Sequence, residues 1–160
     1  MSRRGLSADG VNRLYLFLFF VVGALAAQLS IQELAIQQGR ALAVWGMLFP
    51  LAAALLLSVS AAGVILIPVT ALGLGAVCGL TANGLVEDLP VLGLAAGKEI
   101  LVLLLTVPVF FAVAVRGMAL SSVLCACLER QRRSFGGNVF RPFVPMTAAV
   151  LLVGAVRYFL

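Results

Sequence analysis

The sequence predicts an all-α fold, a polytopic bundle of about five helices that crosses a membrane. Of its 160 residues, 63% are hydrophobic and only 11% carry a charge, whereas about a quarter of the residues in an ordinary soluble domain are charged. The mean hydropathy is +1.18, and so few polar side chains cannot cover a surface that faces water. We therefore expect the apolar excess to face lipid or other membrane helices, in one transmembrane domain over residues 1–160.

Five apolar segments have the length that a membrane helix needs. A bilayer core takes about 20 residues in a helix that rises 1.5 Å per residue. The uncharged run from Ala41 to Leu85 is too long for one helix, and we place its break at Ser58–Gly63, where small and polar residues gather. The expected spans are about residues 14–29, 41–58, 63–85, 100–115 and 144–160.

Charges bound the fourth of these spans. It follows the pair Lys98–Glu99 and is expected to stop at Arg116. The preceding residues 91–97 either begin this span or form a separate re-entrant piece, and the sequence leaves both readings open. Residues 118–128 are expected to be helical although they are less uniformly apolar.

The basic residues predict the orientation, because cytoplasmic loops of membrane proteins carry an excess of Lys and Arg. Eight of the 11 basic residues precede the first span or lie in the expected loop at about 116–143. These regions fall on one side of a five-span protein, so we predict a cytoplasmic N-terminus and an external C-terminus in the cell membrane. The eight are Arg3, Arg4, Arg13, Arg116, Arg130, Arg132, Arg133 and Arg141.

The N-terminal segment also imitates a secretory signal peptide. Two arginines precede an apolar run that ends in small residues, Ala24–Ala27, which is the pattern of a cleavage site. The run is long for a signal core and Gln28 follows the small residues. We therefore expect a retained first span.

Small residues recur every four positions in three segments. In lipid, where hydrophobicity does not drive helix association, such faces let helix backbones approach closely. We expect them to serve packing within the chain, with a partner interface as the alternative. The third span is the best candidate for such an interface because it has three small residues in register. The residues are Gly23 and Ala27, then Ala71, Gly75 and Gly79, then Gly93 and Gly97.

Lys98 and Glu99 are the one acid–base pair expected near the membrane core. An ionisable residue within a membrane is a functional-site hypothesis by default. The alternative, which we favour, is an interfacial pair in which the long side chain of Lys98 reaches the headgroups. Neighbouring residues on a helix point about 100° apart, so the two are not expected to pair with each other.

The composition argues against an enzyme. The chain has no histidine, which removes the commonest general base and the commonest metal ligand. A Ser-His or Cys-His dyad and a phosphate-binding Gly-Lys-Ser/Thr loop are also missing. We expect no catalytic residue, no cofactor and no metal site.

A pattern of glycines and prolines covers most of residues 13–116. It comprises the basic-apolar start Arg13-Leu14-Tyr15-Leu16-Phe17-Leu18-Phe19-Phe20 with Gly23, then Gly63, Pro68, Gly75 and Gly79, then Gly97-Lys98 and Pro108. This layout resembles the stage II sporulation protein M family, membrane proteins of spore-forming bacteria. The resemblance implies a scaffold that helps localise two peptidoglycan-degrading enzymes at the septal membrane during engulfment of the forespore.

Two functions follow as hypotheses. The first is a non-catalytic membrane scaffold of this sporulation type, which recruits or stabilises cell-wall-remodelling partners. The alternative is a small transport component that binds a solute among its helices, because Pro50, Pro68 and Pro108 interrupt three spans as in many transporters. The expected partners are membrane lipid, membrane or membrane-associated proteins such as peptidoglycan hydrolases, and a second copy of the chain. No nucleic acid is expected.

Overall fold

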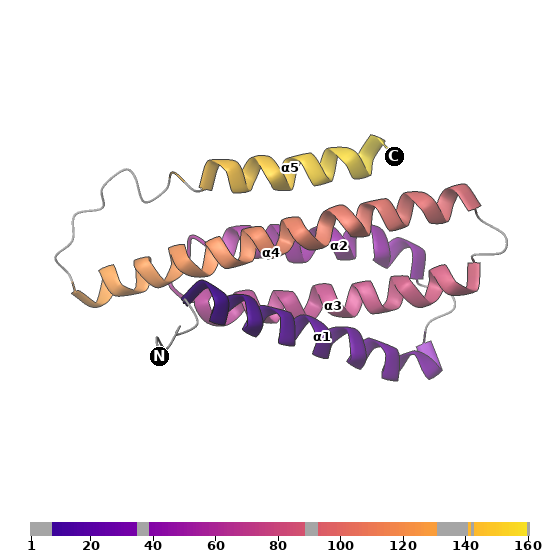
Figure 1. The fold of residues 1–160 in the computed structure, drawn as a ribbon, viewed down its shortest axis with the longest axis horizontal. Coiled ribbons are helices and arrows are strands. Elements are labelled where there is room, and N and C mark those ends of the chain that lie inside the picture. The colour runs from indigo at the N-terminus through magenta and orange to yellow at the C-terminus, as the bar shows by residue number, and fades with distance from the viewer. Residues whose placement is uncertain (1–7, 35–38, 89–92, 131–140, 142, 160) are drawn as a thin grey trace, which may run out of the picture.

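Five helices make up the described part of the chain (Figure 1). The computed structural model describes residues 8–34, 39–88, 93–130, 141 and 143–159. Within these ranges it describes the side chains of residues 10–29, 46–82, 97–98, 100–126, 141 and 143–159. The helices are α1 (Ala8–Leu34), α2 (Gly39–Leu57), α3 (Gly63–Asp88), α4 (Gly93–Arg130) and α5 (Phe143–Phe159).

Three of the helices are long and apolar enough to cross a membrane. Their apolar stretches are Gly10–Leu29, Gly63–Ala82 and Ile100–Ala126. Two shorter apolar stretches, Gly46–Leu57 and Phe143–Phe159, lie in α2 and α5. The predicted all-helical fold with five helices is thus confirmed, and a multi-pass membrane protein is the architecture that fits this composition.

The break between α2 and α3 lies where small residues gather in the sequence. The last turn of α2 closes with Ser58 N–H donating to the Ala54 carbonyl at 3.1 Å. Ser60 N–H then donates to the Leu57 carbonyl at 3.0 Å, and Gly63 N–H donates to the Ser60 carbonyl at 3.1 Å. These three-residue turns reverse the chain within a few residues, and so α2 and α3 are antiparallel neighbours.

α4 is longer than the sequence predicts. It runs unbroken over 38 residues, so the helix does not end at Arg116, and residues 118–128, which were expected to be helical, belong to it. Arginine is a good helix former, and one glycine costs a helix only about 1 kcal/mol, so Arg116-Gly117 does not end it. Residues 93–97 also belong to α4, which favours the start of a span over a re-entrant piece. Residues 91 and 92 lie outside the described residues.

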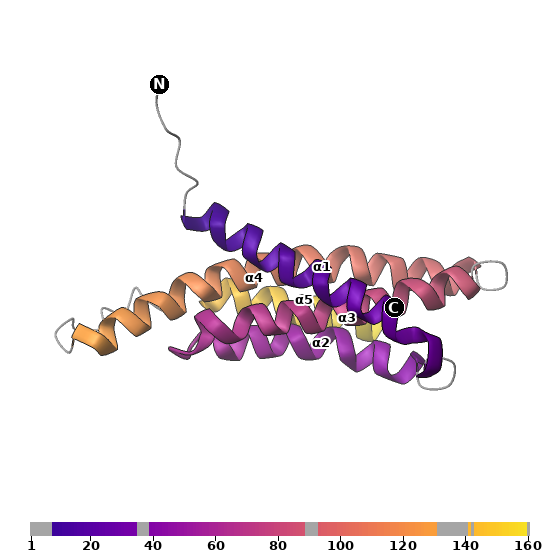
Figure 2. The same ribbon diagram turned by 90° about the horizontal axis from the view of Figure 1, so that it is seen from below.

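Successive helices run in alternating directions, so α1, α3 and α5 point one way and α2 and α4 the other (Figure 1). The view turned by 90° places α5 behind α4 and α2, and shows α1 crossing α3 obliquely (Figure 2). In both views the C-terminal end of α4 extends beyond the other four helices.

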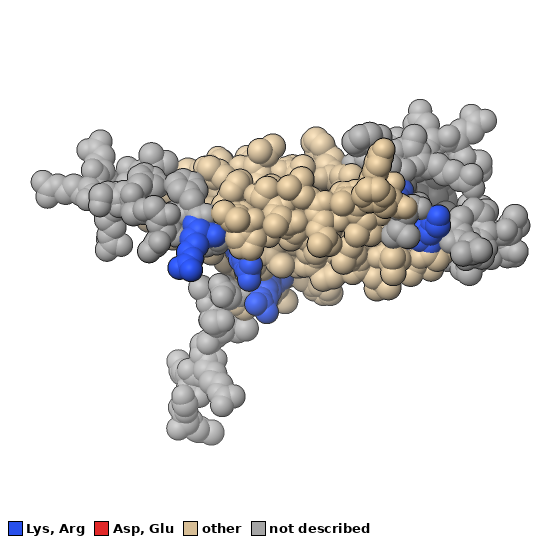
Figure 3. Space-filling model, turned by 90° about the horizontal axis from the view of Figure 1, so that it is seen from above, with Lys and Arg blue, Asp and Glu red and all other residues tan. Residues whose placement is uncertain are grey.

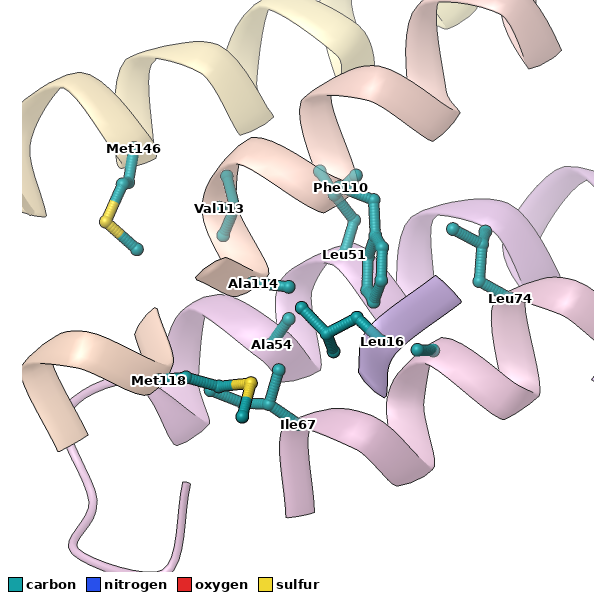
Figure 4. Close-up of a cluster of buried hydrophobic side chains, with 11 residues drawn as sticks. Leu16, Leu51, Ala54, Ile67, Leu74, Phe110, Val113, Ala114, Met118 and Met146 are labelled. Atoms are coloured by element: carbon teal, nitrogen blue, oxygen red, sulfur yellow. The ribbon is translucent and has the colours of Figure 1, made fainter. Parts of the chain in front are cut away.

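The core lies where the first four helices meet (Figure 4). Leu16 of α1, Leu51 of α2 and Phe110 of α4 are fully buried there. Met146 brings α5 against this cluster. The aromatic rings of Phe20 and Phe111 add an edge-to-face contact between α1 and α4, with ring centroids 5.7 Å apart. Most large side chains on the outside of the bundle are apolar, as lipid-facing helices require.

Candidate functional site

α1 and α3 meet backbone to backbone. A Cβ atom placed on Gly23 would collide with the carbonyl oxygen of Leu72 in α3, and one on Gly75 would collide with the carbonyl oxygen of Phe20 in α1. Glycines from both helices therefore face the backbone of the other helix. Only a residue without a side chain permits this approach.

The same contact continues one turn further along both helices. A Cβ atom on Gly79 would lie 2.8 Å from the carbonyl oxygen of Ala24 and 3.3 Å from the Cβ of Ala27. Ala71 lies one turn before Gly75 on the same face of α3 and is fully buried. We call Gly23, Ala27, Ala71, Gly75 and Gly79 the glycine seam. Four of the seven small residues singled out in the sequence thus lie at one contact within the chain, and a fifth, Ala71, is buried one turn before it.

The remaining two small residues are placed differently. Gly97 is exposed, and no atom lies within 4 Å of a Cβ placed on it. Gly93 is the first residue of α4, and its surroundings lie outside the described side chains. The spacing of Gly93 and Gly97 matches that of the glycine seam, yet Gly97 has no helix against it.

Lys98 is exposed near the N-terminal end of α4, whereas the side chain of Glu99 lies outside the described residues. An exposed lysine at a helix end favours the interfacial interpretation over a charge within the bundle. The structure therefore gives no support to Lys98 as part of a solute site among the helices.

A second contact, which the sequence reasoning missed, joins α4 to the start of α3. The Ser121 hydroxyl of α4 donates to the Ser60 carbonyl at 2.6 Å and accepts from the Val64 N–H at 3.0 Å. The first N–H groups of a helix lack partners within that helix, so Ser121 supplies from another helix what a capping residue normally supplies locally. A Cβ atom on Gly63 would lie 2.9 Å from the Ser121 hydroxyl.

One turn before Ser121, α4 also packs closely against the end of α2 and the start of α3, at Gly117. A Cβ atom on Gly117 would lie 2.9 Å from the Cβ of Ser58 and 3.1 Å from a methyl group of Ile67. Ser58 is fully buried, and its hydroxyl donates to the Leu55 carbonyl at 2.6 Å. We call Ser58, Ser60, Gly63, Gly117 and Ser121 the serine junction. Its signal in the sequence is the four-residue spacing of Gly117 and Ser121, which lies beyond the expected end of the fourth span and was not among the small-residue faces singled out.

The interior carries only neutral polar groups among the described side chains. Its buried polar residues are Ser58, Thr106 and Ser121, and no buried side-chain nitrogen or oxygen lacks a hydrogen-bond partner. The Thr106 hydroxyl donates to the carbonyl of Val102, one turn earlier on α4, at 2.7 Å. Within the same part of the chain, no three His, Cys, Asp or Glu residues gather as a metal site would require.

The described basic residues lie at the two ends of the bundle (Figure 3). Arg13 near the start of α1, Arg116 within α4 and Arg141 just before α5 share one end, because α1 and α5 begin on the side towards which α4 runs and α4 continues past them. Lys98 near the start of α4 and Arg157 in the last turn of α5 share the other end. An apolar belt separates the two groups.

The thickness of this belt fits a bilayer. Lys98 and Arg116 are 18 residues apart on one helix, which corresponds to about 27 Å at 1.5 Å per residue. The hydrocarbon core of a bilayer is about 30 Å thick, and long basic side chains reach outward to the headgroups.

No protein-family model, curated protein or solved structure matches this chain. The resemblance to the stage II sporulation protein M family therefore stays a prediction.

Proposed function

We propose that this chain is a non-catalytic membrane scaffold in which all five helices cross the bilayer. α2 has 19 residues and α5 has 17, which lies within the range of about 17–25 for a membrane helix. In α4, the 18 residues from Lys98 to Arg116 span the apolar belt and fall in the same range. With five crossings the termini lie on opposite sides, and the excess of basic residues before the first span and after the fourth predicts a cytoplasmic N-terminus.

The observation that carries the scaffold proposal is the extension of α4. Beyond Arg116 the helix continues for 14 residues, which is about 21 Å at 1.5 Å per residue. Its first turns rest on the serine junction, and its end extends past the other helices (Figures 1 and 2). A rigid helix anchored in the membrane and projecting on the cytoplasmic side suits the recruitment of a partner. The neutral interior, in contrast, gives a solute or a reaction little to interact with.

We further propose that the partners remodel the cell wall, as the sporulation resemblance implies. Cross-linking tests this directly. A photoreactive amino acid at Ser122, which is exposed on the α4 extension, should form adducts with a peptidoglycan hydrolase or its membrane adaptor. The matched control is Leu104, which is 69% exposed within the apolar belt. Adducts at neither position, or equally at both, would contradict recruitment through α4.

A reporter fusion tests the five crossings. A reporter that is active only in the cytoplasm should be silent when fused after Leu160 and active when fused before Ala8. Activity after Leu160 would contradict the odd number of crossings, while leaving the described helices unchanged.

The transport alternative is favoured by the prolines inside α2, α3 and α4. The double variant Lys98→Gln, Glu99→Gln separates the two functions, because it removes the one acid–base pair expected near the membrane. Complementation of a deletion strain should give normal sporulation and unchanged uptake if the chain is a scaffold. Loss of uptake by a normally inserted double variant would instead identify a transporter.

A further inference from the structure

Three arginines from distant parts of the sequence share one rim of the apolar belt. Arg13, Arg116 and Arg141 are all exposed, and α4 packs against both α1 and α5, so Arg116 belongs to the central helix of the three. In the space-filling view, basic side chains gather on one face near this end of the belt (Figure 3). The sequence predicted that the three lie on one side of the membrane, and the structure adds that they come from α4 and the two helices packed against it, although 103 residues separate the first two arginines.

Arg116 stands out because it lies inside an apolar helix. Its neighbours Val113, Ala114, Gly117 and Met118 are all buried against the bundle, whereas Arg116 itself faces outward. The guanidinium therefore plays no part in the packing of the bundle. It stands at the height where the lipid headgroups begin, if the belt spans the hydrocarbon core.

The exposed surface of α4 on the belt side of Arg116 is apolar. Leu104, Pro108 and Ala112 precede Arg116 at steps of four residues and so share its face of α4. All three are exposed, and Leu104 has 69% of its surface exposed. The 12 residues from Leu104 to Arg116 cover about 18 Å, which is close to the depth of one leaflet, half of about 30 Å. This face offers a path for an acyl chain that ends at a guanidinium.

We propose that Arg13, Arg116 and Arg141 bind the headgroup of an anionic phospholipid, with an acyl chain along the Leu104–Ala112 face of α4. Guanidinium groups bind phosphate oxygens through paired N–H donors, which a lysine cannot reproduce. Basic surfaces between membrane helices are known sites for anionic headgroups. The apolar path below Arg116 favours a lipid over free phosphate. This inference rests on the proposed membrane insertion but not on the proposed scaffold partners.

Lipid binding by the purified protein tests the proposal. Short-chain phosphatidylglycerol or phosphatidylcholine is added to the protein in neutral detergent, and bound lipid is counted by native mass spectrometry. Phosphatidylglycerol should bind in preference. Arg116→Gln should weaken its binding about fivefold, and the triple Arg→Gln variant should abolish the preference, since each basic group near a headgroup contributes a factor of about five. Arg116→Lys should recover only part of the affinity.

Matched controls are Lys98→Gln and Arg157→Gln, which remove the same charge at the opposite end of the belt. These variants should keep the preference for phosphatidylglycerol. The proposal is overturned if they weaken binding as much as Arg116→Gln does, because binding would then follow net charge alone. It is also overturned if inorganic phosphate competes as well as the lipid does, which would identify a phosphate site.

The thermal unfolding midpoint of each lipid-free variant shows that its fold is intact. Equal binding of both lipids by the wild-type protein would contradict the lipid site. The scaffold proposal would still be tested separately by cross-linking through α4.

Discussion

The glycine seam and the serine junction hold helices together in opposite ways. At the seam, Gly23, Gly75 and Gly79 bring two backbones into contact through the absence of side chains. At the junction, one side chain, that of Ser121, bridges α4 to the backbone at the start of α3 through hydrogen bonds of 2.6 and 3.0 Å. The first contact depends on shape and the second on polarity.

The difference reflects what each contact has to satisfy. Backbone groups in the middle of α1 and α3 are hydrogen-bonded within their own helices, so close packing is the remaining source of attraction in lipid. At the start of α3, the Val64 N–H is one of the first groups of the helix, which lack a partner within that helix, and it takes the Ser121 hydroxyl instead. Substitutions should therefore damage the seam by adding atoms and the junction by removing them.

The largest effect is expected where side chains would have to enter the glycine seam. Replacing both Gly75 and Gly79 with leucine should lower the free energy of unfolding by about 3 kcal/mol or more, because overpacking one position costs about 1–3 kcal/mol. Unfolding of the purified protein in mixed micelles with increasing dodecyl sulfate measures this loss.

The matched control for the seam is the double variant Gly97→Leu, Gly154→Leu. No atom lies within 4 Å of a Cβ placed on either glycine, so this variant should unfold almost as the wild type does. An equal loss in both double variants would show that the seam is no tighter than the rest of the surface.

The next largest effect is expected at the serine junction. Ser121→Ala removes the acceptor of the Val64 N–H, and a buried polar group left without a partner costs about 1–3 kcal/mol, whereas the Ser60 carbonyl keeps the Gly63 N–H as its donor. Ser122→Ala is the control, because Ser122 is exposed and its hydroxyl donates within its own helix to the Ala119 carbonyl. The same unfolding assay should show a change within about 0.5 kcal/mol for the control. Similar losses at both serines would refute the bridging role.

A smaller effect of opposite sign is expected beside the seam. Gly73 lies two residues before Gly75 on α3, but a Cβ placed on it would meet nothing within 4 Å. Gly73→Ala should raise the free energy of unfolding by about 0.5–1 kcal/mol, because glycine weakens a helix interior relative to alanine by this amount. Gly75→Ala should lower it instead. If both alanine variants shift the free energy of unfolding in the same direction, the assignment of Gly75 to the face of α3 that contacts α1, and of Gly73 away from it, is wrong.

The smallest effect is expected at Thr106. Its hydroxyl is buried but donates to the Val102 carbonyl of its own helix, and that carbonyl keeps its ordinary helical N–H partner in a valine variant. Thr106→Val should therefore change the free energy of unfolding by about 0.5 kcal/mol or less. If Thr106→Val lowers the free energy of unfolding as much as Ser121→Ala does, the loss at Ser121 does not come from its bridging of two helices.

Several features of the fold were open to prediction from local chemistry. The scarcity of charge predicted the membrane class, and the small and polar residues after Leu57 predicted where α2 and α3 separate. The four-residue spacing of Gly75 and Gly79 predicted a face for close packing. These features depend on residues near one another in the sequence, where helix geometry alone fixes which side chains share a face.

The continuity of α4 through Arg116 was not predicted. Residues 118–128 were expected to be helical, but only the structure shows that Gly117 and Ser121 pack against the turn after α2 as part of the same helix. The sequence therefore determined the all-helical fold, the five helices of the described residues and the small faces they carry.

The tertiary structure decided which small face meets which helix. Gly23 and Gly75 pack against opposing backbones, whereas Gly97 faces open space although its spacing is the same. The physical reason is that lipid is as apolar as a neighbouring helix, so hydrophobicity does not select the partner. The choice depends on the fit of two backbones and on bridges such as that of Ser121, which join residues about 60 positions apart.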